Sequence, residues 1–125
     1  MPILIIRTSA PIAEGKKEEL LKAATKVLAD AGRKESHVMV VLEKVDGSMG
    51  GKIAPIACVE MRSMAGLTHE FNHKISEGIC SMLERILGIT GHNVYLNFIG
   101  IPEGAWGCDH GIYVYKPATK EWVIE

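Results

Sequence analysis

Hydrophobic residues recur along the chain with two different spacings, and each spacing predicts a different kind of element. Continuous apolar and β-branched runs, which are typical of buried strands, occupy residues 2–8, 37–45, 55–62 and 93–99. Apolar residues three and four positions apart predict helices over residues 14–31 and 67–87. The two helical stripes consist of Leu20, Ala24, Val27, Leu28 and Ala31, and of Leu67, Phe71, Ile75, Ile79, Met82, Leu83 and Ile86.

The predicted elements form two similar β-α-β halves. Pro2-Ile-Leu-Ile-Ile opens the first half, and Pro55-Ile-Ala-Cys-Val opens the second. Two such halves related by a pseudo-twofold axis give an α/β (α+β) fold, a four-stranded mixed sheet with both helices on one face. Strands this apolar predict that the uncovered face is buried between copies of the chain in a closed homo-oligomer. We expect residues 46–51 to form a loop, and residues 112–115 and 122–124 to form short edge strands.

Composition limits the class of protein. The chain has 125 residues, of which 47% are hydrophobic and 23% charged, so we expect a single globular domain spanning residues 1–125. Its 14 basic and 15 acidic residues give a net charge of −1, which argues against a nucleic-acid partner. No apolar run reaches the length of a membrane span, and the N-terminus lacks the charged segment of a signal peptide. We therefore expect neither a membrane protein nor a classically secreted one.

Three widely spaced cysteines, Cys58, Cys80 and Cys108, indicate a reducing compartment, and we expect a cytoplasmic protein. Cys58 lies in a predicted strand, where we expect it to belong to the core. Cys108 lies in a loop beside Trp106.

The segment His69-Glu-Phe-Asn-His73 matches the zinc-protease pattern H-E-x-x-H. On a helical wheel, both histidines lie opposite the apolar stripe of their helix, and no other histidine offers a convincing third ligand. We therefore expect a solvated helix face at this position and no metal site.

Pro2 is the residue with the clearest chemical interest. Initiator methionine is normally removed before a small residue such as proline, and its removal would place a secondary amine at the head of a buried strand. Apolar surroundings and nearby cations disfavour the charged form of an amine and lower its pKa. A base that titrates near neutral pH suits general acid–base catalysis, so Pro2 is a candidate catalytic residue. The alternative is a proline that only starts a strand.

Further residues occur in an order and spacing that resemble the macrophage migration inhibitory factor (MIF) family of the tautomerase superfamily. They are Met1-Pro2-Ile-Leu-Ile-Ile-Arg-Thr-Ser with Pro11, Ala31-Gly32-Arg33, the Pro55 strand, Ser63-Met64, Asn72, Val94-Tyr-Leu-Asn-Phe98 and Trp106-Gly107. The resemblance implies a β-α-β-β-α-β protomer in a homotrimer, whose three sheets enclose a channel. It also implies an isomerase that interconverts the keto and enol forms of small aromatic α-keto acids such as phenylpyruvate, with the N-terminal proline as its base and no cofactor.

The resemblance assigns roles to single positions. Pro2 would move the proton. Arg33 takes the place of the family's lysine that helps to hold the substrate carboxylate, and the adjacent Lys34 is the alternative. Ser63 and Met64 would border the pocket. Without the resemblance, Arg33 is a cation near a helix end and Met64 is core filler.

Three aromatic or polar residues complete the implied site. Tyr95 and Asn97 match residues that a neighbouring subunit contributes, and Trp106 matches the tryptophan at the rim. Taken alone, Tyr95 is a strand aromatic and Trp106 is a loop anchor.

The chain departs from the family pattern at two places. The C-x-x-C pair of the animal members is replaced by Ile56 and Val59, so a thiol–disulfide oxidoreductase role has no support. The tail of residues 108–125 diverges and is longer. It contains three candidates for a missing aromatic at the pocket mouth: Tyr113, Tyr115 and Trp122.

Two other functions stay open. Animal members of the family are extracellular signalling proteins, so a MIF-like cytokine mimic that binds a host receptor, secreted without a signal peptide, is one alternative. A superfamily dehalogenase or decarboxylase, which uses a charged proline with paired arginines and an acidic residue, is the other. Arg62 lies in the third predicted strand, but no paired arginine accompanies it in the sequence.

Overall fold

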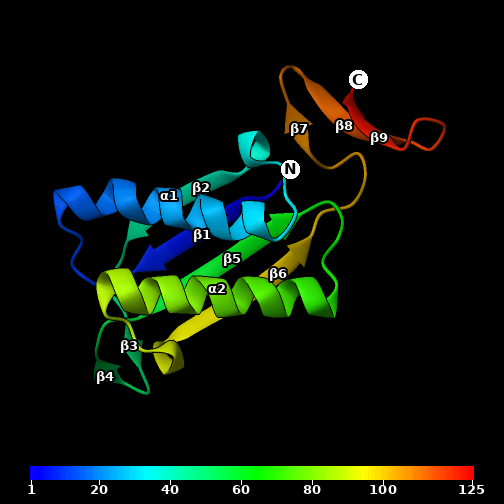
Figure 1. Cartoon of the computed structure of the whole chain (residues 1–125). Coiled ribbons are helices and arrows are strands. Elements are labelled where there is room, and N and C mark those ends of the chain that lie inside the picture. Colours follow the sequence, from blue (N-terminus) through cyan, green and yellow to red (C-terminus); the bar gives the residue numbers. More distant parts are fainter.

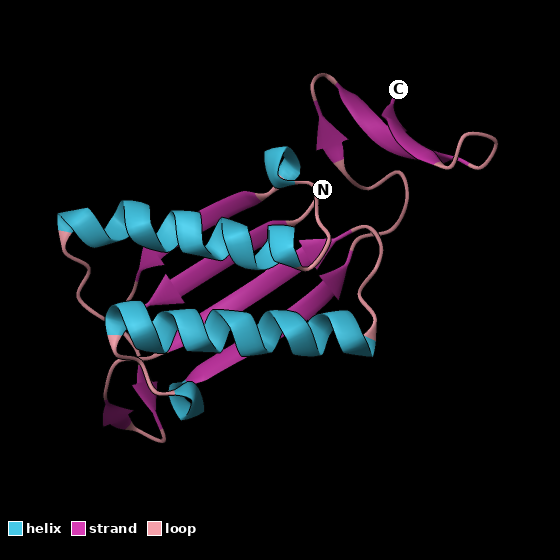
Figure 2. Ribbon diagram, viewed as in Figure 1, coloured by secondary structure: helices cyan, strands magenta, loops and turns pink.

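A four-stranded sheet and two helices form two layers in the computed structural model, which describes residues 1–125 (Figures 1 and 2). The helices are α1 (Glu14–Asp30) and α2 (His69–Leu87), and both cover the same face of the sheet. The sheet contains, in spatial order, β2 (Met39–Lys44), β1 (Ile3–Thr8), β5 (Ala57–Ser63) and β6 (Val94–Gly100). This is the predicted β-α-β-β-α-β order, and the fold class is confirmed.

The strand pairing follows the two-half organisation of the sequence. β1 is parallel to β2 and β5 is parallel to β6, as a β-α-β connection requires, whereas the two halves meet through an antiparallel β1–β5 pair. In the central pair, Ile3 lies opposite Arg62 and Thr8 lies opposite Ala57. The first strand of one half, β1, therefore begins at one end of the sheet, and the first strand of the other half, β5, begins at the opposite end.

Local signals in the sequence position the second helix. The Thr68 side chain accepts a hydrogen bond from the Phe71 amide at 3.1 Å and caps the N-terminus of α2. Gly88, with a φ of 70°, takes the left-handed conformation that ends the helix. Gly78 allows the two helices to approach each other, because a Cβ there would lie 2.7 Å from Cγ1 of Val27.

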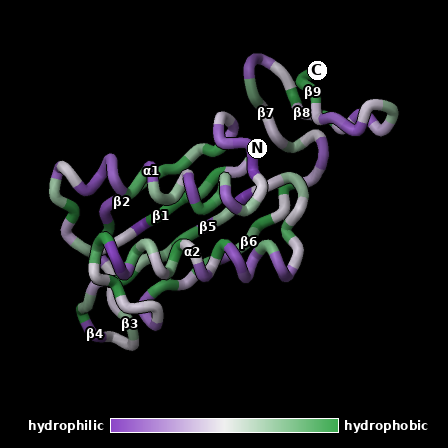
Figure 3. The backbone as a smooth tube through the Cα atoms, in the orientation of Figure 1, coloured by the Kyte–Doolittle hydropathy of each residue, from purple (hydrophilic) through white to green (hydrophobic).

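The core lies between the helices and the covered face of the sheet. Hydrophobic positions run along the central strands and alternate with hydrophilic positions along both helices (Figure 3). Both predicted stripes face this core, either fully buried or packed against it. Fully buried members include Leu4, Ile6, Leu28, Met61 and Ile79.

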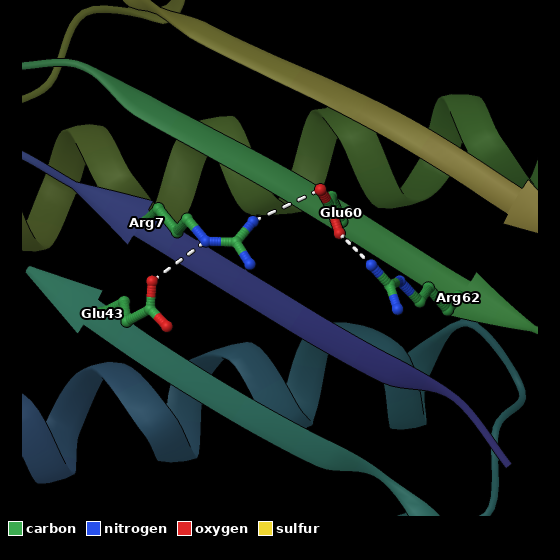
Figure 4. A network of polar contacts seen from close by, with 4 residues as sticks. All are labelled: Arg7, Glu43, Glu60 and Arg62. Carbon is green, nitrogen blue, oxygen red and sulfur yellow. Dashed lines mark hydrogen bonds and ion pairs between the residues drawn. The ribbon is translucent and has the colours of Figure 1, made fainter. Parts of the chain in front are cut away.

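The opposite face of the sheet carries no helix, and its centre is more polar than we expected. Arg7, Glu43, Glu60 and Arg62 form a chain of ion pairs there, so an apolar open face is the wrong description of its centre (Figure 4). Cys58 is also exposed on this face and does not belong to the core. The physical reason is that side chains alternate along a strand, and the covered face takes the odd-numbered residues of β5.

Two segments outside the main sheet differ from the expectation. The predicted loop of residues 46–51 contains part of a small hairpin, β3 (Ser48–Met49) and β4 (Lys52–Ile53). The predicted edge strands do not join the main sheet. They pair with each other in a separate sheet of β7 (Gly107–Cys108), β8 (Gly111–Lys116) and β9 (Glu121–Ile124), because short turns offer each strand a local partner.

This C-terminal sheet projects from the end of the molecule at which the N-terminus lies (Figure 1). Two single-turn helices, Glu35–His37 and Gly91–Asn93, precede β2 and β6. Neither long helix has the length and apolar character that crossing a membrane requires.

Candidate active site

Pro2 is buried at the head of β1. Its carbonyl oxygen accepts a hydrogen bond from the Met39 amide at 3.1 Å, which holds the head of β1 against the start of β2. Pro2 also lines a pocket of about 300 Å³. The other lining residues are Met1, Ile3, Ser36, His37, Met39, Trp106, Gly107, Cys108 and Tyr113. The candidate base therefore borders a cavity in the size range of small-molecule sites.

The surroundings of the N-terminus favour a neutral amine. Burial lowers the pKa of the Met1 α-amino group below its usual value, and the positive charge of Arg33 lowers it further. Burial and a nearby cation are the two causes of a lowered pKa that the sequence analysis expects for an amine at Pro2. Pro2 is more deeply buried than Met1, so removal of Met1 would move the amine toward the protein interior.

Arg33 lies between the end of α1 and the loop that follows β5. Its Nη2 donates a hydrogen bond to the Ala65 carbonyl oxygen at 2.8 Å, and its guanidinium carbon lies 4.3 Å from the centre of the Phe71 ring. Burial lowers the pKa of Arg33, but a guanidinium remains charged at neutral pH. Its Nε is buried without a hydrogen-bond partner, so this cation has an unused donor. Lys34 is exposed.

Ser63 and Met64 end β5 beside this arginine. The Ser63 hydroxyl donates to the Ala65 carbonyl oxygen at 2.9 Å, and that oxygen also binds Arg33. The Ser63 carbonyl oxygen accepts the Ile101 amide at 2.9 Å. Ser63 is buried and Met64 is half-buried, and neither lines the pocket beside Pro2. Their contact with a substrate stays a prediction.

Tyr95 and Asn97 lie away from Pro2 within one chain. Both project from β6 on the open face, and Tyr95 is 68% exposed. The residue of β6 level with the head of β1 is Ile99. Tyr95 is four positions earlier, about 13 Å along the strand at roughly 3.3 Å per residue. A single chain therefore does not bring these two residues to the pocket.

Trp106 reaches the Pro2 pocket together with one aromatic of the C-terminal sheet. The Tyr113 amide donates to the Trp106 carbonyl oxygen at 2.9 Å, and both residues line the pocket. The rings of Tyr115 and Trp122 instead contact each other, with centroids 5.2 Å apart. Of the three aromatic candidates in the tail, Tyr113 is the one that the fold places beside Pro2.

Tyr113 and Cys108 are neighbours in this wall. Burial raises the pKa of the Tyr113 phenol, and the adjacent Cys108 raises it further. The phenol therefore stays protonated at neutral pH and can donate a hydrogen bond. Both residues lie in the divergent tail of residues 108–125. The sequence alone does not predict their proximity to Pro2, because it depends on how β7 and β8 pair.

A second pocket, of about 240 Å³, adjoins the first. It shares Ile3, Trp106 and Gly107 with the Pro2 pocket, and Ile101, Ala105 and Arg62 complete its lining. The sequence predicts no paired arginine for Arg62. In space Arg7 is its neighbour, since both arginines bind Glu60, so that part of the interpretation is wrong.

Larger pockets occur at the other end of the sheet. One of about 520 Å³ lies between α1 and β2 and is lined by Ile12, Lys17, Leu21, Val40, Leu42 and Lys44. Another, of about 470 Å³, lies at the head of the second half and includes Pro55. Neither contains an arginine or a terminal amine.

His69 and His73 are both exposed at the start of α2, with ring centroids 6.5 Å apart. They face away from the core, as the helical wheel predicts. No third histidine, cysteine or carboxylate joins them in a cluster that could hold a metal ion.

Comparison with known proteins identifies the family. The family model for macrophage migration inhibitory factor (MIF) matches residues 1–111. A MIF homolog of Trichuris trichiura is 32% identical over 103 residues, which are 79% of this chain and 88% of the relative. The crystal structure of a MIF-like protein from Entamoeba histolytica has a TM-score of 0.83 and 34% identity, and the match covers 87% of this chain and 96% of that one. The MIF of Toxoplasma gondii has a TM-score of 0.81 and 29% identity, with 85% and 95% coverage. This chain belongs to the MIF family of the tautomerase superfamily.

Proposed function

We propose that this chain is a keto–enol tautomerase for phenylpyruvate-like α-keto acids, that it works as a homotrimer, and that Pro2 is its catalytic base after removal of Met1. Membership of the tautomerase superfamily supports an isomerase role. The observation that carries the proposal is the buried position of Pro2 beside a 300 Å³ pocket, in surroundings that lower the pKa of the N-terminal amine.

In the proposed reaction, the neutral Pro2 nitrogen removes a proton from the carbon next to the substrate ketone. The same nitrogen, now protonated, returns the proton to the other end of the enol system. A base with a pKa near the working pH does both steps well, because it is neutral before the first and acidic enough for the second.

Arg33 is the better candidate to hold the substrate carboxylate. Its charge acts on the N-terminal amine, and its Nε has no protein partner. Only Nη2 of this guanidinium donates a side-chain hydrogen bond within the chain, so a carboxylate would bind its remaining terminal N–H groups through charge-assisted hydrogen bonds. Lys34 is exposed and so has a weaker claim to this role.

The remaining parts of the site come from two sources. Trp106 and Tyr113 line the pocket and would contact the aryl group of the substrate, and exclusion of water by these rings helps to keep the amine neutral. Tyr95 and Asn97 would come from the neighbouring subunit and would bind the developing enol oxygen. Their exposure on the open face supports this assignment.

The decisive experiment compares two prolines. Pro2→Gly replaces the fixed secondary amine with a mobile primary amine and should lower the rate of phenylpyruvate tautomerisation by about a hundredfold, within the range that a well-placed general base contributes. The matched control is Pro55→Gly, since Pro55 opens the second half and should retain activity. Mass spectrometry of the intact protein should show that Met1 is removed. Equal activity of Pro2→Gly and wild type, or a retained Met1, would rule out the proposed base.

A hydrolytic reaction with a charged proline is the second candidate. It is favoured by one observation, the pairing of Arg7 and Arg62 through the carboxylate of Glu60. The pH–rate profile separates the two reactions, because a base mechanism gains activity as the amine loses its proton, whereas a charged proline loses activity over the same range.

A further inference from the structure

The second pocket contains a single charged residue. Five of its six lining residues, Ile3, Ile101, Ala105, Trp106 and Gly107, offer apolar surface or backbone, and the sixth is Arg62. No carboxylate lines this pocket. A cation at the edge of a largely apolar cavity selects for an anionic ligand, because the ligand's charge is poorly solvated there unless it meets the cation.

The guanidinium of Arg62 has unused hydrogen-bonding capacity. Its Nη2 donates to Oε2 of Glu60 at 2.7 Å, and its Nε is buried without any partner. A guanidinium has five N–H donors, so one ion pair leaves most of them free. The side chain is 40% exposed, which leaves the group accessible from the pocket.

Glu60 pairs with two arginines, of which Arg62 is the nearer. The other oxygen of the same carboxylate accepts a bond from Nη1 of Arg7 at 3.3 Å, while Nε of Arg7 binds Glu43 at 3.0 Å. Arg62 is thus the last residue of a chain of alternating charges across the open face (Figure 4). Of the four residues, only Arg62 lines the pocket.

The Arg62 pocket adjoins the pocket of the candidate base, and the two share part of their walls. Ile3 follows Pro2 in the chain and lies opposite Arg62 in the sheet, and Trp106 lines both cavities. A molecule whose reacting carbon lies beside Pro2 would extend past Ile3 and Trp106 to bring a second functional group to Arg62.

We infer that Arg62 forms a subsite for a second carboxylate, so that the favoured substrates of this chain are 2-oxo dicarboxylic acids. This inference rests on the proposed tautomerase function and changes the favoured substrate from an aryl-bearing to a carboxylate-bearing α-keto acid. Arg33 holds the carboxylate next to the ketone, and Arg62 binds the carboxylate at the far end of the substrate.

The test measures turnover of two substrates that differ at the far end, the enol forms of oxaloacetate and of phenylpyruvate. Arg62→Gln should lower kcat/KM for oxaloacetate at least tenfold, as expected for loss of a charge-assisted hydrogen bond, and should change kcat/KM for phenylpyruvate less than threefold. Arg62→Lys keeps the charge and should recover part of the oxaloacetate activity. Arg85→Gln removes an exposed arginine in the last turn of α2 and is the matched control, for which both values should stay unchanged.

A binding measurement separates the subsite from the chemistry. Succinate and 3-phenylpropionate match the two substrates but lack the ketone, and their Kd is measured by calorimetry. Succinate should bind Arg62→Gln at least tenfold more weakly than wild type, whereas 3-phenylpropionate should bind both equally. This binding result supports the subsite even if neither keto acid is turned over. The absence of turnover would reject only the proposed tautomerase function. If Arg62→Gln changes the Kd of both ligands equally, or changes neither, the subsite proposal is overturned. Turnover of phenylpyruvate that depends on Pro2 would still support the tautomerase function.

Discussion

The two faces of the main sheet are built from the same four strands but differ in composition and exposure. On the covered face, Leu4, Ile6, Val59 and Met61 are fully buried under the helices. On the open face, the alternate positions carry an ion-pair chain and the exposed ring of Tyr95. The covered face holds the protomer together, whereas the open face presents charged and aromatic groups to its surroundings. The difference indicates that folding and function are divided between the two sides of one sheet.

The strongest test of this division uses two variants that are inactive for different reasons. Pro2→Gly exchanges the proposed base for a poorly positioned primary amine, and Tyr95→Ala lacks a group that we assign to the neighbouring site. When the two are unfolded together and refolded as a mixture, about a quarter of the sites in a closed ring combine an intact Pro2 with an intact neighbouring Tyr95. We expect tautomerase activity near a quarter of the wild-type value, measured on phenylpyruvate. Activity no higher than the mean of the separate variants would place Tyr95 in its own chain's site or outside any site.

A second test compares apolar truncations on the two faces. Ile79→Ala removes a fully buried side chain from α2, and we expect a loss of about 2–5 kcal/mol in the free energy of unfolding, measured by urea denaturation. Ile5→Ala, on the open face, should instead raise the protein concentration at which the oligomer dissociates, measured by sedimentation. If both substitutions lower unfolding stability equally and neither changes assembly, the open face is not an interface.

The smallest expected effect concerns Arg33, which packs against α2 on the covered side. Its charge lowers the pKa of the N-terminal amine, so Arg33→Gln should raise that pKa and reduce the neutral fraction at a given pH. The ascending limb of kcat/KM against pH should therefore move to higher pH, although burial, the larger cause of the lowered pKa, is retained in this variant. The pH at which kcat/KM rises reports the pKa of the amine, whereas the maximum value of kcat/KM reports how well the substrate carboxylate is bound. A limb that stays in place would show that Arg33 does not act on the base.

The covered face was predictable from sequence because burial repeats with the period of each element. The apolar stripes of both helices and the order of the main helices and strands along the chain follow from spacing alone, and both are confirmed. The alternation of buried and exposed side chains was harder to recognise in β5. Val59 faces the helices there, so its neighbour Cys58 faces the opposite side and is exposed. The apolar runs 37–45 and 55–62 hide this alternation, which explains the wrong expectation for Cys58.

The pocket was less predictable because it depends on pairings between distant segments. Arg62 reaches the second pocket through its register with Ile3, and Tyr113 reaches the first through the separate C-terminal sheet. Neither relation leaves a periodic signal in the sequence. The role of Arg33 came from a resemblance, whereas that of Pro2 came from its position after Met1 as well as from the resemblance, and the geometry around the N-terminus supports both without testing them.

The repeated halves have a chemical consequence. Pro2 and Pro55 open equivalent units at opposite ends of the sheet, and a cavity lies beside each proline. The Pro55 nitrogen is bonded to the carbonyl carbon of Ala54, so its lone pair is delocalised into the amide and cannot accept a proton. Backbone symmetry is thus not symmetry of reactivity. In the proposed enzyme, one of two matching ends is basic because of covalent connectivity, a property that no side-chain substitution at Pro55 would transfer to it.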